Sequence, residues 1–202
     1  MAKHRVFISY HHANDQWAKD RLIELNNEYG IFEDESVDTG DINDEYMTDE
    51  QIRIKIRDEY LRQTTVTILL VGTETQYRKH IDWEVYSSMR DSEKNPKSGI
   101  VVIMLPSTGC THCYASHNEE KTEVFPTFSD WKSVNTRAEF ERDYPCLPPR
   151  IIDNLLKEGV KISIATWNSL NVAQLRILID NAFEYRENQD YDFTRPMRRR
   201  NG

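Results

Sequence analysis

The chain has 202 residues, of which 38% are hydrophobic and 30% charged, and its formal net charge is −8. Aromatic residues make up 10%, which excludes an intrinsically disordered protein. No apolar stretch approaches the about 20 residues of a membrane span, and the acidic balance disfavours binding to nucleic acid or anionic membranes. Three cysteines are too few for a disulfide scaffold, and no signal-peptide core opens the sequence, so we expect a cytoplasmic protein.

The first quarter of the chain predicts a strand, a helix and a second strand. Arg5–Ser9 is a short β-rich run. The helix should start at an N-cap, Asn14 or Asp15, and end at Gly30, where a left-handed residue is favoured. Residues 31–49 begin with an apolar pair that opens the second strand and continue as an acidic stretch, which we interpret as a solvated loop.

The middle of the chain alternates helices with continuous apolar strands. Thr48-x-x-Gln51 has the form of a capping box and predicts a helix start. Thr65–Val71 and Gly99–Leu105 are apolar runs typical of strands buried on both faces. The segment between them predicts a helix from about residue 76 to residue 89. Its inward face, read from the spacing of four, consists of Tyr77, Ile81 and Val85.

The last part of the chain is less regular. Residues 106–150 hold most of the prolines and no sustained period, so we expect an irregular insertion before the last strand. A short helix near residues 150–158, a strand at Val160–Thr166 and a final helix capped at Asn171 follow. Residues 191–202 are basic and broken by proline, and we expect a disordered tail.

Alternation of helices with doubly buried strands predicts an α/β fold with an open parallel sheet. We expect residues 1–190 to form one domain, with the insertion at 106–150 inside it. In such a sheet, ligands bind beyond the carboxyl ends of the strands. The sequence has neither a GxGxxG dinucleotide loop nor a GxxxxGK[ST] phosphate loop at those ends.

Glu84 is the most informative residue of the predicted helix. It lies about 20° from Tyr77 around the helix axis, at the edge of the buried face. Burying an unpaired carboxylate is costly, so Glu84 needs a cation, hydrogen-bond donors or a ligand. Two interpretations remain open: a boundary glutamate paired with a neighbouring Arg or Lys, or a functional carboxylate that faces the crevice.

Several segments in order carry a family resemblance. They are RVFISYHHAND, IFEDESV and TVTILLVGTETQYRKHIDWEV, the last ending in a helix with an aromatic residue before Glu84. Together they resemble the TIR-like family of bacterial anti-phage defence, and most closely the TIR protein of Thoeris systems. The resemblance covers residues 4–105 well. It implies a flavodoxin-like, TIR-like fold, with a parallel sheet of about five strands flanked by helices.

The resemblance also implies a function. Similar proteins cleave the nicotinamide–ribose bond of NAD and make an ADP-ribose-derived signal, cyclic or conjugated, that activates a partner effector. NAD is then a substrate, no cofactor or metal is expected, and the other partners are a phage-derived trigger and further copies of the chain. Glu84 matches the catalytic glutamate of the family. The substrate-binding residues that the resemblance implies are Phe7, Ser9, Tyr10, His11, Asn14, Asp34, Tyr77 and Trp83.

Other functions fit parts of the sequence. A non-catalytic TIR scaffold, acting through contacts between copies, would keep Glu84 in an ion pair. A phosphoacceptor domain of the response-regulator kind needs an acidic cluster after the first strand, where Ser9 and Tyr10 stand instead.

Three groups of residues have part of a metal-site pattern. Cys110 and Cys113, with His117 and Cys146 nearby, could hold zinc, but a single short CxxC favours inert loop thiols. His11 and His12 are adjacent and lack a third ligand. The acidic run 34–50 lacks the glycine-centred spacing of a calcium loop, so a solvated loop is favoured.

Overall fold

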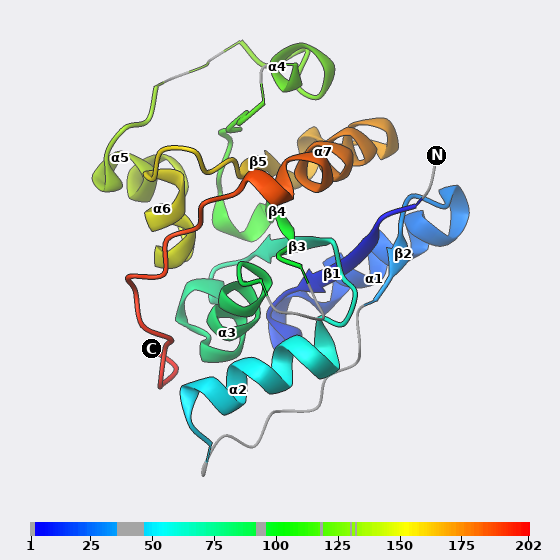
Figure 1. Cartoon of the computed structure of the whole chain (residues 1–202). Helices are drawn as coiled ribbons and strands as arrows, with labels where there is room; N and C mark the ends of the chain where they lie inside the picture. The colour runs from blue at the N-terminus through cyan, green and yellow to red at the C-terminus, as the bar shows by residue number, and fades with distance from the viewer. Residues whose placement is uncertain (1–2, 36–46, 92–95, 118, 130, 132) are drawn as a thin grey trace.

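A five-stranded parallel sheet forms the centre of the computed structural model, which describes residues 3–35, 47–91, 96–117, 119–129, 131 and 133–202 (Figure 1). The strand order is β2-β1-β3-β4-β5, with every neighbouring pair parallel. This confirms the predicted flavodoxin-like, TIR-like α/β fold. The strands are β1 (Arg5–Ser9), β2 (Glu33–Asp34), β3 (Val66–Val71), β4 (Gly99–Met104) and β5 (Ser163–Thr166).

Helices cover both faces of this sheet. Alternate strand residues point to opposite faces, so Val6 and Ile8 of β1 pack with the helices on one face, while Phe7 packs on the other. The first face carries α1 (His12–Tyr29) and α7 (Val172–Tyr185). The second face carries α2 (Asp49–Lys55), the π-helix η1 (Ile56–Tyr60), α3 (Lys79–Ser88), α5 (Arg137–Asp143) and α6 (Pro149–Leu155).

Two helix starts differ from the sequence expectations. The carbonyl of His11 accepts hydrogen bonds from the amides of Asn14 and Asp15, so α1 begins at His12 rather than after them. The helix predicted for residues 76–89 is split by Arg78, whose backbone is extended, into the 3-10 turn η2 (Thr75–Tyr77) and α3. Tyr77 is therefore outside α3 and 40% exposed, rather than on its inward face.

Other local predictions are confirmed. Gly30 ends α1 with a φ of 59°, in the left-handed region. Thr48 and Gln51 form the predicted capping box of α2, and Asn171 forms one with Gln174 at the start of α7. Most of the acidic stretch after β2, residues 36–46, lies outside the described residues. None of the described helices is long and apolar enough to cross a membrane.

The insertion at residues 106–150 is attached to the sheet rather than separate from it. It holds the turn η3 (Pro106–Thr108), the short helix α4 (Glu120–Glu123) and α5. An isolated antiparallel bridge joins Tyr114 to Ile164 of β5. The fully buried Glu120 accepts a 2.6 Å hydrogen bond from Ser163 of β5, which gives a buried oxygen its partner and fixes the insertion at this edge of the sheet.

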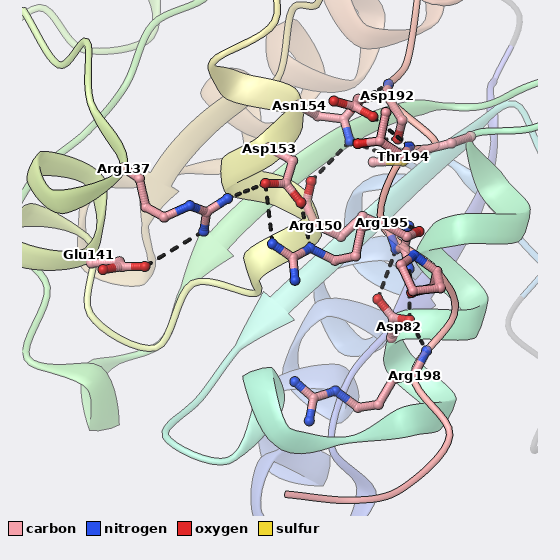
Figure 2. Close-up of polar contacts among 12 residues, drawn as sticks. Asp82, Arg137, Glu141, Arg150, Asp153, Asn154, Asp192, Thr194, Arg195 and Arg198 are labelled. Carbon is pink, nitrogen blue, oxygen red and sulfur yellow. Dashed lines mark hydrogen bonds and ion pairs between the residues drawn. The ribbon is translucent and has the colours of Figure 1, made fainter.

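The C-terminal segment 191–202, expected to be disordered, packs along α6 and α3 (Figure 2). Arg150 of α6 is 1% exposed, and its guanidinium pairs with Asp82 of α3 through two bonds of 2.8 and 2.9 Å. The same guanidinium donates to the backbone carbonyls of Arg195 and Pro196, each at 3.0 Å. A buried guanidinium has five N–H donors that require acceptors. Its hydrogen bonds to these two carbonyls hold the segment against α6.

Further contacts hold the end of this segment on α3. The backbone amide of Arg198 donates to Asp82 at 2.8 Å, and its carbonyl accepts the indole N–H of Trp83 at 2.7 Å. Met197 is buried beside Trp83, and the amide of Gly202 donates to the Tyr77 carbonyl at 2.9 Å. Sequence composition does not predict this docking because its anchors lie on distant helices.

Candidate functional site

The candidate site lies at the carboxyl edge of the sheet, where β1 and β3 end side by side. From β1 the chain crosses to β2 on one side and then returns to β3 on the other. This reversal leaves a crevice outside the strand ends, and open α/β sheets bind their ligands at such a point. Ser9 is the last residue of β1, and Gly72 directly follows β3.

A hydrogen bond between Ser9 and Glu84 forms the centre of this site. Ser9 is 1% exposed, and its side chain points to the face that α3 covers. Its hydroxyl donates to Glu84 Oε2 at 2.6 Å, which ties the carboxylate of α3 to the end of β1. Burial raises the pKa of Glu84 to about 7, although the bond from Ser9 lowers it. Both protonation states of Glu84 are therefore populated near neutral pH.

Glu84 is not held by a cation. Within the described ranges, no Lys, Arg or His forms an ion pair with its carboxylate, and Ser9 is its one hydrogen-bond partner. The described structure therefore does not support the interpretation of Glu84 as a boundary residue that a neighbouring Arg or Lys neutralises. A partly buried carboxylate at a sheet crevice, with one oxygen left without a protein donor, can accept hydrogen bonds from a ligand.

Asp15 places a second carboxylate beside the end of β3. It is 3% exposed, and its Oδ2 is buried without a hydrogen-bond partner in the described structure. The carboxylate packs directly on Gly72, since a Cβ at Gly72 would lie 2.4 Å from Asp15 Oδ2. Burial raises the pKa of Asp15. Only glycine at position 72 leaves room for this carboxylate at the crevice.

His11 and Arg78 add basic groups near the same strand ends. Burial lowers the pKa of His11, and the positive charge of Arg78 lowers it further, although Glu74 acts in the opposite direction. His11 Nδ1 is buried with no partner among the described residues. Arg78 forms an ion pair of 2.9 Å with Glu74. The imidazole of His11 is therefore neutral at pH 7 and available to form a hydrogen bond.

Three of the predicted substrate-binding residues are core residues in the structure. Phe7 is 2% exposed and Trp83 0% exposed, and both pack in the cluster under α2 and α3. Tyr10 is 6% exposed, stacks on His12 with ring centroids 4.4 Å apart, and donates its hydroxyl proton to Gln16. These side chains support the walls of the crevice and do not line it openly.

The remaining predicted residues lie around the site without converging on Glu84. Asn14 is exposed on the first turn of α1. Asp34 ends the short strand β2 but pairs in register with Val6, three residues before Ser9, and is therefore set back from the end of β1. The exposed Tyr77 contacts the C-terminal segment. Of the predicted set, the structure brings Ser9 together with Glu84 and places His11 at the same edge.

Sequence patterns do not reveal the roles of Asp15 and Arg78 at this site. Asp15 is predicted only as a helix cap, and no pattern singles out Arg78. Two sequence features could have pointed to Asp15. It follows the first strand closely, and Gly72 comes directly after the third strand. Neither pattern says that the two residues touch.

A basic pocket beside α3 has Arg78 in common with this site. It has a volume of ≈ 220 Å³ and opens between α3, α6 and the C-terminal segment. Its walls include Arg78, Asp82, Arg150, Arg195 and Arg198, but not Glu84. Ile81 and Val85 also line it, whereas neither Ser9 nor Glu84 is among its lining residues.

The cysteines do not form a metal site in the described part of the chain, which contains no group of three or more His, Cys, Asp or Glu side chains placed to hold an ion. Cys110, Cys113 and Cys146 are free thiols. Burial raises the pKa of Cys110 to about 11, and its thiol donates to the Asp143 carbonyl at 3.5 Å. A neutral, hydrogen-bonded thiol agrees with the interpretation of inert loop cysteines.

Comparison with known proteins gives one family. The model of the TIR-like domain of Thoeris protein ThsB matches residues 7–109, about half of the chain. The match runs from within β1 to beyond the end of β4 and therefore includes Ser9, Gly72 and Glu84. No protein with a curated description matches the sequence.

Proposed function

Because the chain belongs to the family of the TIR-like domain of Thoeris protein ThsB, we propose that it is an anti-phage defence enzyme that cleaves the nicotinamide–ribose bond of NAD. The product is an ADP-ribose-derived signalling molecule, cyclic or conjugated, that activates a partner effector. A phage-derived trigger and assembly of several copies belong to the same proposal. The observation that carries it is the Glu84 carboxylate, held by Ser9 at the strand ends without a cation.

The chemistry of this bond suits a single carboxylate. Cleavage builds positive oxocarbenium character on the ribose, and a nearby carboxylate stabilises that charge. The nicotinamide ring of NAD is cationic while it is bound to the ribose and leaves as a neutral molecule, so no general acid has to protonate it. Ser9 occupies Oε2 of Glu84, which leaves Oε1 for the hydroxyls of the sugar.

The pKa of Glu84 determines the pH range of this mechanism. The carboxylate has to be ionised to stabilise a cation, and its pKa is about 7. The rate should therefore rise with pH through neutrality and level off above it. The removal of solvent that raises the pKa also strengthens the interaction between the carboxylate and the positive ribose.

The anionic diphosphate of NAD needs a locally basic environment on a chain of net charge −8. Arg78 and the neutral His11 lie at the same edge of the sheet, and the backbone after β3 begins with Gly72. We assign the diphosphate to these groups, with Glu84 reserved for the ribose.

The main alternative is a non-catalytic scaffold that acts through contacts between copies of the domain. That function predicts a Glu84 neutralised by an ion pair, because a structural role gives no reason to keep a carboxylate in a costly environment. Glu84 is instead partly buried, bonded to Ser9 and without a cation, which supports the catalytic function.

The decisive experiment compares NAD consumption by the wild type, Glu84→Gln and Glu158→Gln. Glu158 is an exposed glutamate after α6, so its variant controls for the loss of one negative charge. We expect Glu84→Gln to lose at least about a hundredfold in rate, as when a preorganised charge is removed, and Glu158→Gln to match the wild type. Mass spectrometry of filtrates from infected cells identifies the product. Wild-type turnover by Glu84→Gln would refute the assignment.

A further inference from the structure

A small pocket at the ends of β4 and β5 lies on the same edge of the sheet as Glu84. It has a volume of ≈ 230 Å³ and is lined by Met104, Pro106, Cys110, Thr111, Thr166, Trp167 and Asn168. Met104 and Thr166 are the last residues of the two strands. Pockets that enclose whole drug-sized ligands measure about 300–1,000 Å³. This one therefore suits a single ring system.

The pocket offers the surfaces that a planar heterocycle needs. Trp167 supplies an indole ring, while Met104 and Pro106 supply further apolar surface. Asn168 and Thr111 are exposed, and both have polar side chains on the pocket wall. An Asn side chain can form two hydrogen bonds with adenine, one to its amino group and one to a ring nitrogen. Stacking on an aromatic ring and a polar edge contact together define a base-binding site.

Trp17 connects this pocket with the site at β1 and β3. Its ring packs edge-to-face with that of Trp167, with centroids 5.1 Å apart, although Trp17 remains 47% exposed. Trp17 follows Asp15, the residue that packs on Gly72, by two positions in α1. The first turns of α1 thus contact both places, through Trp17 at the base pocket and through Asp15 at Gly72.

The spacing of the strands agrees with one ligand reaching both places. Neighbouring strands lie about 4.8 Å apart, so the end of β1 is about 10 Å from that of β4 and about 14 Å from that of β5. Two riboses and a diphosphate separate the two rings of a dinucleotide over a span of this order. With the nicotinamide riboside at Glu84, the other base falls at β4 and β5.

We propose that the Trp167 pocket binds the adenine base of the nucleotide substrate, stacked on Trp167, which Trp17 holds in place, and hydrogen-bonded by Asn168. This inference rests on the proposed function for the identity of the ligand. It adds a second recognition site to that function and makes the enzyme selective for adenine nucleotides.

AMP is the probe that tests the pocket without turnover. We expect the full-length protein to bind AMP at least about tenfold more tightly than ribose 5-phosphate, which lacks the base, since a stacked base contributes about five- to a hundredfold. Trp167→Ala should lose roughly tenfold in AMP affinity, and Trp167→Phe, which retains a ring, should lose much less. Asn168→Ala should reduce the preference for AMP over uridine monophosphate.

Two variants serve as matched controls. Tyr29 is another exposed aromatic residue of α1, at the opposite end of the helix, and Tyr29→Ala should bind AMP like the wild type. Glu84→Gln should also bind AMP normally. If Glu84→Gln still cleaves NAD, the proposed reaction mechanism is wrong. The measurements of AMP binding test the base pocket independently of that result.

The position of the ligand is read from the indole N–H signals in an NMR spectrum. AMP should shift the signals of Trp17 and Trp167 and leave that of Trp83 unchanged, because Trp83 of α3 is fully buried in a different cluster. No binding of AMP to the wild type, equal affinity in Trp167→Ala, or shifts that avoid Trp17 and Trp167 would each overturn the inference.

Discussion

Replacing Glu84 with glutamine should stabilise the protein, and the gain should depend on pH. Burial raises the pKa of Glu84 from 4.5 to about 7, so the folded protein binds this proton more tightly than the unfolded chain does. A group with a raised pKa favours folding below its unfolded value, and that contribution is lost as the pH rises through the folded value. The glutamine side chain of the Glu84→Gln variant does not titrate, so the variant keeps what the wild type loses.

The magnitude follows from the shift. At about 1.4 kcal/mol per pKa unit, a rise from 4.5 to about 7 corresponds to an upper limit of about 3 kcal/mol above pH 8. Glu84 is only partly buried, and water reduces the real value below that limit. Between about pH 5 and about pH 8.5, the stability difference between variant and wild type should grow by about 2–3 kcal/mol at most.

Urea unfolding at the two pH values measures this difference directly. The other groups of the protein titrate equally in both proteins, so their contributions cancel when the variant is compared with the wild type. Glu158→Gln, at an exposed position, should show no such pH dependence. A difference that is the same at both pH values, or a Glu84→Gln protein less stable than the wild type at about pH 8.5, would mean that the carboxylate is well solvated or paired. That result would refute the description of Glu84 as a desolvated carboxylate without a cation.

Three further perturbations test other parts of the site. Ser9→Ala removes the bond that lowers the pKa of Glu84, so the rise of NAD cleavage with pH should move to higher pH in a rate profile. Gly72→Ala puts a Cβ 2.4 Å from Asp15 Oδ2 and should destabilise the fold by about 1–3 kcal/mol in urea unfolding, with Asp15→Ala restoring most of the loss. Deletion of residues 197–202 uncovers the buried tryptophan of α3, so its fluorescence emission should shift to longer wavelength; an unchanged spectrum would contradict the docking of this segment.

The fold class could be predicted because it depends on local patterns. Continuous β-branched runs such as Thr65–Val71 are typical of strands buried on both faces, and helices between them make the sheet parallel. The same periodicity placed Glu84 at the edge of a buried helix face. The sequence by itself thus determined the fold class, the crevice and the principal candidate residue.

The partners of Glu84 were decided only by the tertiary structure. Ser9 lies 75 positions before Glu84 in the sequence, and no spacing rule relates a strand end to a residue of a later helix. For the same reason Phe7, expected at the ligand, was found in the core, because Trp83 and Met197, both distant in the sequence, pack in one cluster with it.

Long-range packing also decided the fate of the C-terminal segment. Its basic composition predicts a solvated tail, since composition reports only what a segment would do alone. The buried guanidinium of Arg150, however, requires acceptors, and Asp82 together with the carbonyls of the segment supplies them. Local patterns fix which face of each element is apolar. The three-dimensional arrangement decides which polar groups meet, because each buried donor needs an acceptor that lies close to it in the folded chain.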